Sequence, residues 1–387
     1  MSLLESPSFQ SLSAPIKTAT LPGEAYVLSI VSLPSYYAIS ASSPDDSIHL
    51  FSKSRLDKVQ TLTKHEGPIT ALRSAHNFAG SLTPVLISSG KDGVVHAWDA
   101  RSPGQPIMTT LQAGRPRALL SCDISANGMT IAAGTELQGD DASVLYWDPR
   151  NPAAPLRAHS STHSDDITDV HFSRTHGSLL LSVSSDGLVS TSNSDEPDED
   201  EAGLHVGNWG CSIAQGGWVH GQSGLTGIWA SSDMETFSVW SGELDLVQDA
   251  DVRQPSVHTG ERTWVTDYFI GAHNNSSIPA GADNDLSLFL GSNEGDIALV
   301  SRPTFADANA PWVLSQTWLT GHSDVVRSFL WDEENNVLLT GGEDSKLNAW
   351  VSPPRTSAST VNAKRENDDA MDVDEDEGIS HRKRRRS

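Results

Sequence analysis

Basic residues are scarce in this chain, which has 26 Lys and Arg against 50 Asp and Glu in 387 residues, a formal net charge of −24. Binding to nucleic acid depends on clustered Lys and Arg, so this deficit argues against direct nucleic-acid binding by the folded part and against an anionic membrane surface. Because opposite charges attract, basic proteins are the partners that the composition favours.

Cysteine and long apolar stretches are also rare. The two cysteines, Cys122 and Cys211, are too few for a disulfide framework and fit a reducing compartment. No apolar run approaches the roughly 18 residues of a membrane helix, and the N-terminus lacks the pattern of a signal peptide. We therefore expect an intracellular protein that has no membrane partner, with enough hydrophobic residues (37 %) for a large core.

Tryptophan, by contrast, is abundant, with 11 residues, and its positions indicate an internal repeat. Residues 85–99 and 337–350 each show an apolar strand, a turn with Asp, and a second strand that reaches a Trp, which is typical of a β-hairpin. Seven such units follow one another at a spacing of about 50 residues. Their ends lie near the following residues: Phe51, Trp98, Trp147, Ser192, Trp240, Val300 and Trp350. Each unit also has a strand upstream of its hairpin, and in the sixth unit residues 264–267 are predicted as this strand.

These units resemble the WD-repeat family, on the strength of Gly321-His322, the pairs Trp98-Asp99 and Trp147-Asp148, and the spacing of six between turn Asp and Trp. The resemblance implies an all-β fold, a single seven-bladed β-propeller of four-stranded antiparallel blades. We expect it over residues 14–352, between a flexible N-terminus (1–13) and a disordered tail (353–387).

The last blade lacks an outer strand from its C-terminal side, because the chain becomes rich in Pro and Ser directly after Trp350. The segment from Pro15 to Leu21 is predicted to supply this strand and to close the ring. Closure matters because it leaves few exposed strand edges.

The resemblance also implies structural tetrads, since in the WD-repeat family a His, a Ser or Thr, an Asp and a Trp form a buried hydrogen-bonded group. A buried Asp needs donors, and ring N–H groups supply them. When the family pattern is matched to this sequence, unit two has the tetrad His65, Ser88, Asp92 and Trp98. Unit seven has the tetrad His322, Thr340, Asp344 and Trp350. Unit four has His163, Ser182 and Asp186, but Ser192 stands where the Trp is expected.

A closer resemblance covers the middle third. The runs H-S-D-D-I-T-D-V-H-F-S (163–173) and S-V-S-S-D-G-L-V-S (182–190), then an acidic insert and G-G-W (216–218), are similar to WD repeat-containing protein 89 and its relatives. That group has no established enzymatic activity. No phosphate-binding loop, dinucleotide fingerprint or nucleophile elbow is present, so we expect no enzyme, no catalytic, cofactor-binding or metal-binding residues, and no cofactor.

The acidic insert, residues 194–201, is predicted as a long connection before the outer strand of unit four. It contains six acidic residues: Asp195, Glu196, Asp198, Glu199, Asp200 and Glu201. Two interpretations remain open. The insert is a solvated loop that keeps the protein soluble, or it is a docking site for a basic partner.

Two consecutive units end in Trp-Asp-x-Arg, which places Arg101 and Arg150 two residues after Asp99 and Asp148. Such tandem copies resemble the motif by which some WD-repeat proteins act as substrate receptors of cullin-4 ubiquitin ligases, with the Arg contacting the ligase adaptor. The alternative is that each Arg simply pairs with the Asp before it.

The tail ends in a basic cluster typical of a nuclear import signal: Arg382, Lys383, Arg384, Arg385 and Arg386. Residues 353–387 contain eight basic and eight acidic residues, so the whole net charge of −24 belongs to the rest of the chain. We expect a nuclear protein with some cytoplasmic pool, a monomer within a larger complex.

The sequence thus predicts a protein-interaction scaffold for a basic client such as a ribosomal protein, a ribosome assembly factor or a histone tail. The alternative function is that of a cullin-4 substrate receptor.

Overall fold

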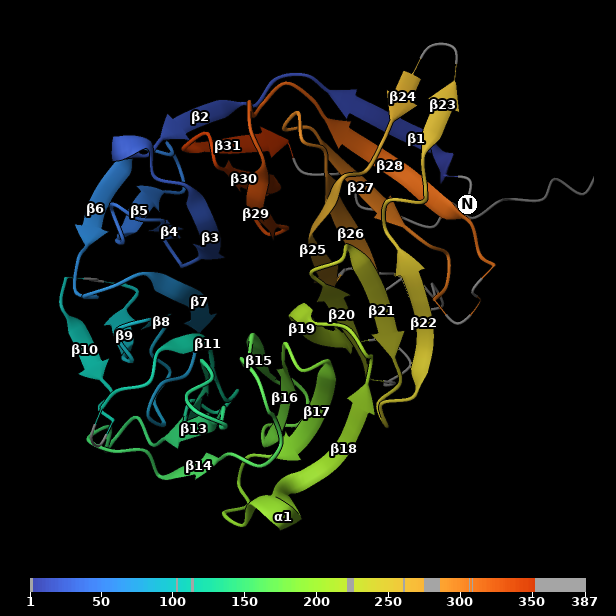
Figure 1. Cartoon of the computed structure of the whole chain (residues 1–387). Helices are drawn as coiled ribbons and strands as arrows, with labels where there is room; N and C mark the ends of the chain where they lie inside the picture. The colour runs from blue at the N-terminus through green and yellow to red at the C-terminus, as the bar shows by residue number, and fades with distance from the viewer. Residues whose placement is uncertain are drawn as a thin grey trace, which may run out of the picture. The chain divides into compact units, whose positions relative to one another are not determined.

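The computed structural model describes residues 3–101, 104–112, 115–220, 226–259, 262–274, 286–305, 307 and 309–351. The chain divides into two units, residues 1–356 and residues 357–387, and the second lies wholly outside the described residues. Nearly every regular element in the described part is a strand (Figure 1). No helix in that part is long and apolar enough to cross a membrane.

Seven sheets form the blades of a β-propeller around a central opening (Figure 1), which confirms the predicted fold. From innermost to outermost strand, blades one to three consist of β3 (Val27–Ser32), β4 (Tyr36–Ala41), β5 (Ile48–Ser52) and β6 (Lys58–Leu62); β7 (Ile69–Ala75), β8 (Val85–Gly90), β9 (Val95–Asp99) and β10 (Pro106–Thr109); β11 (Leu119–Ile124), β12 (Ile131–Thr135), β13 (Val144–Trp147) and β14 (Arg157–His159). Blades four and five consist of β15 (Asp169–Phe172), β16 (Leu179–Val183), β17 (Leu188–Asn193) and β18 (Gly203–Asn208); β19 (Ile213–His220), β20 (Thr226–Ser232), β21 (Thr236–Trp240) and β22 (Leu246–Asp251). Blades six and seven consist of β25 (Tyr268–Asn274), β26 (Leu286–Gly291), β27 (Ile297–Ser301), β28 (Trp312–Trp318) and an added β1 (Leu3–Leu12); β29 (Val326–Asp332), β30 (Val337–Gly342), β31 (Lys346–Val351) and β2 (Lys17–Thr20).

The middle strands of a blade are buried on both faces, because each blade is stacked between two others. All six residues of β8 (V-L-I-S-S-G) are buried, so this strand reads as a run of apolar and small residues rather than as an alternation. The residue that ends each predicted unit lies in the third strand of a blade. Three of these residues, Trp98, Trp147 and Trp350, have at most 1 % of their surface exposed. Burial of a ring of this size contributes on the order of 3 kcal/mol.

The N-terminal segment closes the ring as predicted. Strand β2 pairs antiparallel with β31, with Lys17 opposite Ala349 and Thr20 opposite Lys346. The seventh blade therefore takes three strands from the C-terminal end of the propeller and its outermost strand from the N-terminal end.

The prediction of a flexible segment at residues 1–13 is wrong for the part that the structure describes. Strand β1 lies parallel to β28 and adds a fifth strand to blade six, with Leu3 opposite Trp312 and Leu12 opposite Trp318. Strand β1 is held in place by apolar contacts. Leu3 is buried in the hydrophobic cluster of blades five and six, and Phe9 packs against this cluster. The segment L-L-E-S-P-S-F-Q-S-L shows no regular alternation, and its register shifts between Glu5 and Gln10.

The prediction of residues 264–267 as the upstream strand of the sixth unit is also wrong, because the strand that precedes the hairpin of blade six begins at Tyr268. Residues 264–267 belong instead to a longer connection that contains a two-stranded hairpin of β23 (Val257–Thr259) and β24 (Arg262–Trp264). Trp264 looks like one of the repeated tryptophans in the sequence, but its side chain is buried in the hydrophobic cluster of blades five and six. Two further elements are short: the 3-10 helix η1 (Pro22–Glu24) and the helix α1 (Glu199–Ala202).

Candidate functional site

The structure brings together all four residues of the tetrads in blades two and seven. In blade two, His65 Nδ1 lies 2.9 Å from Asp92 Oδ2, His65 Nε2 lies 2.8 Å from Ser88 Oγ, and the Trp98 indole donates to Ser88 Oγ at 3.0 Å. Blade seven repeats this geometry with nearly equal distances, 3.0, 2.8 and 2.9 Å, among its tetrad residues: His322, Asp344, Thr340 and Trp350.

The hydrogen bonds of the tetrad determine where the protons lie. The Asp92 carboxylate can only accept, so the His65 Nδ1 that faces it carries a proton and donates it. The Ser88 hydroxyl accepts from the Trp98 N–H and donates its own proton to His65 Nε2. Burial opposes ionisation of Asp92, but hydrogen bonds from His65 and from the backbone N–H groups of Glu66 and Val94 outweigh it and lower the pKa of Asp92.

Blade four has a tetrad without its Trp. His163 Nε2 lies 2.8 Å from Ser182 Oγ, while His163 Nδ1 is 3.4 Å from Asp186, farther than in the other two blades. Ser192 ends the repeat in β17 and supplies no indole donor. Despite burial, contact with His163 and with the backbone N–H groups of Ser164 and Leu188 lowers the pKa of Asp186 to about 2.

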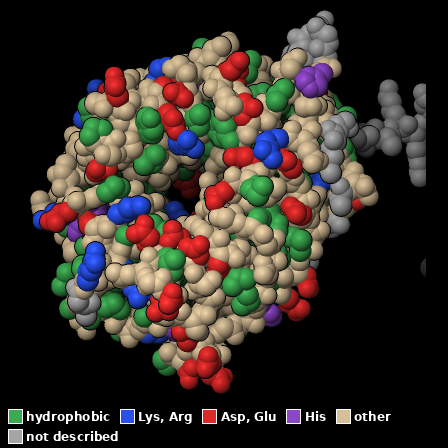
Figure 2. Space-filling model, viewed as in Figure 1, with side chains coloured by type: hydrophobic (Ala, Val, Ile, Leu, Met, Phe, Trp, Pro, Cys, Tyr) green, Lys and Arg blue, Asp and Glu red, His purple; other side chains and the backbone are tan. Residues whose placement is uncertain are grey.

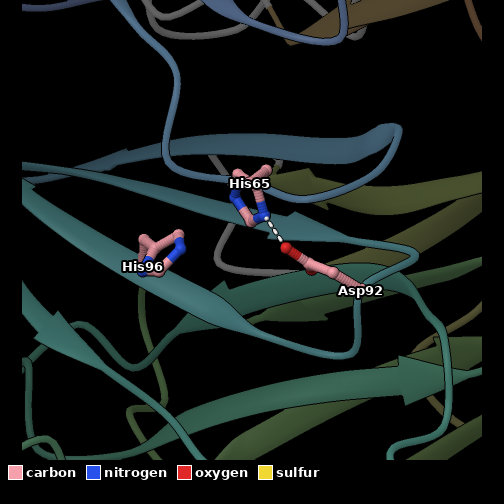
Figure 3. A group of neighbouring side chains, drawn as sticks. All are labelled: His65, Asp92 and His96. Atoms are coloured by element: carbon pink, nitrogen blue, oxygen red, sulfur yellow. Dashed lines mark hydrogen bonds and ion pairs between the residues drawn. The ribbon is translucent and has the colours of Figure 1, made fainter.

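Among the residues that the structure describes, one cluster offers side chains of the kinds that bind metal ions, namely His65, Asp92 and His96, whose ligand atoms lie within 4.8 Å of one another (Figure 3). At least three of its four ring nitrogens already take part in hydrogen bonds. Both ring nitrogens of His65 are engaged in the tetrad, and His96 Nδ1 lies 2.9 Å from the Thr109 hydroxyl. A metal on His65 Nδ1 would displace the proton that Asp92 accepts. The donor set does not fit a metal, and we assign the cluster a structural role.

The acidic insert forms a connection between β17 and β18, as predicted, and contains α1. Glu199 is not available to a partner, because its carboxylate accepts hydrogen bonds from the backbone N–H groups of Ser160 (2.8 Å) and Ser161 (2.6 Å). These contacts place α1 at the outer rim, beside the end of β14 (Figure 1). Four acids of the insert are exposed: Asp195, Asp198, Asp200 and Glu201; Glu196 is half-buried.

Arg101 and Arg150 each form a fork with the Asp two residues earlier. Arg101 donates to Asp99 at 2.9 and 2.7 Å, and Arg150 to Asp148 at 2.9 and 2.5 Å. Both arginine side chains are more than half exposed. A third pair, which the sequence analysis missed because no Trp precedes it, has Arg253 donating to Asp251 at 2.9 Å. The fork therefore forms locally, without a Trp-Asp repeat end.

The innermost strands line a central cavity of about 600 Å³ with charged side chains. Arg73 on β7 donates to Asp169 on β15 at 2.9 Å, and His171 Nε2 lies 3.0 Å from the same carboxylate. Asp123 on β11 accepts the backbone N–H of Phe172 at 2.7 Å. Burial opposes ionisation of Asp169, yet His171 and Arg73 lower the pKa of its carboxyl. Sequence analysis missed this cluster. The one feature that could have indicated it is the presence of charged residues within the otherwise apolar innermost strands.

The basic cluster Arg382 to Arg386 lies outside the described residues. The import signal therefore stays a prediction.

Comparison with known proteins agrees with this geometry. Residues 56–99 and 312–350 match the family described as "WD domain, G-beta repeat". The chain is 28 % identical to the WD repeat-containing protein GTS1 of Arabidopsis thaliana, over 85 % of this chain and 82 % of that protein. It is 27 % identical to the WD repeat-containing protein 89 homolog of Dictyostelium discoideum, over 85 % and 83 %, and 27 % identical to an uncharacterized WD repeat-containing protein of Schizosaccharomyces pombe, over 84 % and 95 %. The resemblance stated from the sequence is confirmed.

Proposed function

Because this chain is a WD-repeat propeller, we propose that it is a non-catalytic platform that binds a basic segment of a protein partner. A rigid ring that presents many loops is suited to binding rather than to chemistry. The observation that carries the proposal is the distribution of charge. The tail sums to zero, so the propeller has the entire net charge of −24.

Two surfaces concentrate this charge. The first surrounds the central opening, where Figure 2 shows many Asp and Glu side chains on the visible face. One cation at that opening is already held by an acid, since Arg327 lines the central cavity and pairs with Glu343. The second surface is the insert, whose exposed acids follow one another along the rim. Both surfaces would attract Lys and Arg and accelerate encounter at low salt.

The insert is the sharper place to test the proposal. Neutralising D195N, E196Q, D198N, D200N and E201Q together, while Glu199 is kept, removes charge but leaves the hydrogen bonds to Ser160 and Ser161. Binding of a fluorescent Lys/Arg-rich peptide should weaken, and its dependence on salt should become shallower. A matched control is E243Q with D245N, two exposed acids in the equivalent turn of blade five.

The outcomes separate the surfaces. If the insert variant binds like the wild type, the central opening becomes the binding surface. If no basic peptide binds in a salt-dependent manner, the proposal is wrong. Affinity purification of the intact protein would then identify the client, for which ribosomal proteins, assembly factors and histone tails are our candidates.

A second candidate function is that of a cullin-4 substrate receptor. It is favoured by the equal geometry and exposure of Arg101 and Arg150 at the ends of β9 and β13 in adjacent blades. R101A with R150A should abolish capture of the ligase adaptor at an unchanged melting temperature. R253A is the matched control, because Arg253 forms the same fork elsewhere. Full retention of adaptor binding by the double variant would remove this candidate.

Nuclear location is part of the proposal. It rests on the five basic residues at the end of the tail. Replacing Arg382 to Arg386 by Ala in the full chain should move a fluorescent fusion to the cytoplasm. An unchanged nuclear signal would contradict this part of the proposal and leave the binding function untouched.

A further inference from the structure

The outer edges of the blades are protected in all but one case. The unpaired N–H and C=O groups of an edge strand can pair with a strand of another molecule, and proteins prevent this with charged residues or proline in the edge strand. Among the outer strands that the structure describes, five contain such a residue: Lys17 in β2, Lys58 in β6, Pro106 in β10, Arg157 in β14 and Asp249 in β22. The outer strand of blade six, β28, is covered by β1.

Strand β18 is the exception. Its sequence G-L-H-V-G-N contains neither a charged residue nor proline. Leu204 is 49 % and Val206 58 % exposed. At the far end of the strand Gly207 is buried against Trp240 of blade five, where a Cβ would stand 2.9 Å from the ring, whereas residues 203–206 are all exposed. Within the part of the chain that the structure describes, β18 pairs with β17 alone. Residues 203–206 are therefore an open apolar edge.

This protein already uses strand addition on another blade. Strand β1 extends the sheet of blade six by pairing with β28 in two stretches, Leu3 to Glu5 and Gln10 to Leu12. Its apolar residues Leu3 and Phe9 pack into the neighbouring core. An outer strand of this propeller can thus accept a further strand through main-chain hydrogen bonds and a few apolar contacts.

The acidic residues in and next to α1 indicate which kind of partner can bind the open edge of β18. Asp198, Asp200 and Glu201 are exposed and stand directly before Gly203 in the chain. Two copies of the protein that joined through β18 would bring two such clusters together, and like charges would oppose that dimer. A partner segment with Lys or Arg beside its strand would be attracted instead.

We propose that β18 binds an extended segment of a protein partner by strand addition, with apolar side chains of that segment against Leu204 and Val206 and its basic residues against the acids of the insert. The proposal rests on the proposed function, and it specifies the place and the backbone conformation of the bound segment.

The test uses the full chain and a synthetic probe peptide with four lysines followed by three Val-Thr pairs. A control peptide has proline in place of each threonine, so that it keeps its charge but cannot join a sheet. Hydrogen exchange of residues 203–206 should slow with the first peptide and not with the second. The first peptide should bind about tenfold more tightly.

Substitutions locate the contact. V206K should reduce the affinity for the Val-Thr peptide to that for the proline peptide. V59K, on the outer strand β6, is the matched control because Val59 is 54 % exposed, and it should have little effect. Circular dichroism and melting temperature confirm that both variants fold.

The outcomes keep the two proposals distinct. If both peptides bind equally, with salt dependence and without protection of β18, the strand-addition proposal is wrong and the acidic platform stands. If neither peptide binds, both proposals are wrong. Equal binding by V206K and the wild type would also overturn strand addition at this edge.

Discussion

The guanidinium of Arg73 on β7 donates a hydrogen bond to the carboxylate of Asp169 on β15 at 2.9 Å, and this joins blade two to blade four. The bond passes the inner strand of blade three, β11, and links parts of the chain that are 96 residues apart. Both groups line the central cavity, so this pair directly connects the inner strands of two blades.

The variant R73M is predicted to destabilise the propeller. It leaves Asp169 with His171 as its remaining charged partner in a partly buried site, and the loss should be about 1–3 kcal/mol. Denaturant unfolding measures it. Combination with D169N should recover part of the loss, because the carboxylate that lost its partner is then gone. A simple sum of the two single effects would contradict a direct pair.

The variant S88A should remove the centre of the blade-two tetrad. Trp98 then lacks its acceptor and His65 lacks a donor, which should reduce the free energy of unfolding by about 1–3 kcal/mol. S182A in blade four removes the contact with His163 alone, because no Trp is present there. Its effect should be smaller, and equal effects would mean that the indole bond contributes little.

Acid should weaken the protein through the tetrad carboxylates. The folded pKa of Asp186, about 2, lies below the ordinary Asp value of about 3.9. Ionised Asp186 therefore stabilises the fold above about pH 4, and this stabilisation is lost as the pH falls through about 2. Unfolding free energies measured between pH 5 and pH 2 should fall less steeply for D186N. An identical slope in both proteins would show that Asp186 is not a source of the acid sensitivity.

The two N-terminal strands should differ in importance. Deleting residues 1–13 removes β1 but leaves seven four-stranded blades, so the protein should fold with a lower melting temperature and a newly open edge at β28. Deleting residues 1–21 also removes β2 and opens the ring at blade seven. That deletion should abolish cooperative unfolding, as calorimetry can show. If both truncated proteins unfold alike, closure by β2 is unimportant.

Much of the fold was predictable because the same physical requirement recurs seven times. Each buried pair of strands needs a turn, and the tetrads repeat the positions of a buried Asp and its donors, as at Asp92 and Asp344. Strand β2 followed from the missing strand of the last blade. Strand β1 was not predictable, since Leu3 and Phe9 have no periodic neighbours and find their core in residues far along the chain.

The candidate sites were less predictable for a related reason. The composition of the insert indicated exposed charge, but the contact of Glu199 with Ser160 depends on how blades three and four meet. The cluster combines Arg73 from one repeat with Asp169 and His171 from another and has no common motif. The lack of charge and proline in β18 stands out only when this strand is compared with the other outer strands.

Ring closure by β2 has a consequence for how the chain is made. Lys17 leaves the ribosome long before Ala349, its partner in the sheet. Pairings between such distant residues form slowly, because the entropy cost of closing a long loop comes before the stabilising contacts are made. The segment that forms β2 is therefore without its partner strand until β31 has been synthesised, and a chain that stops before β31 would remain an open ring with exposed strand edges.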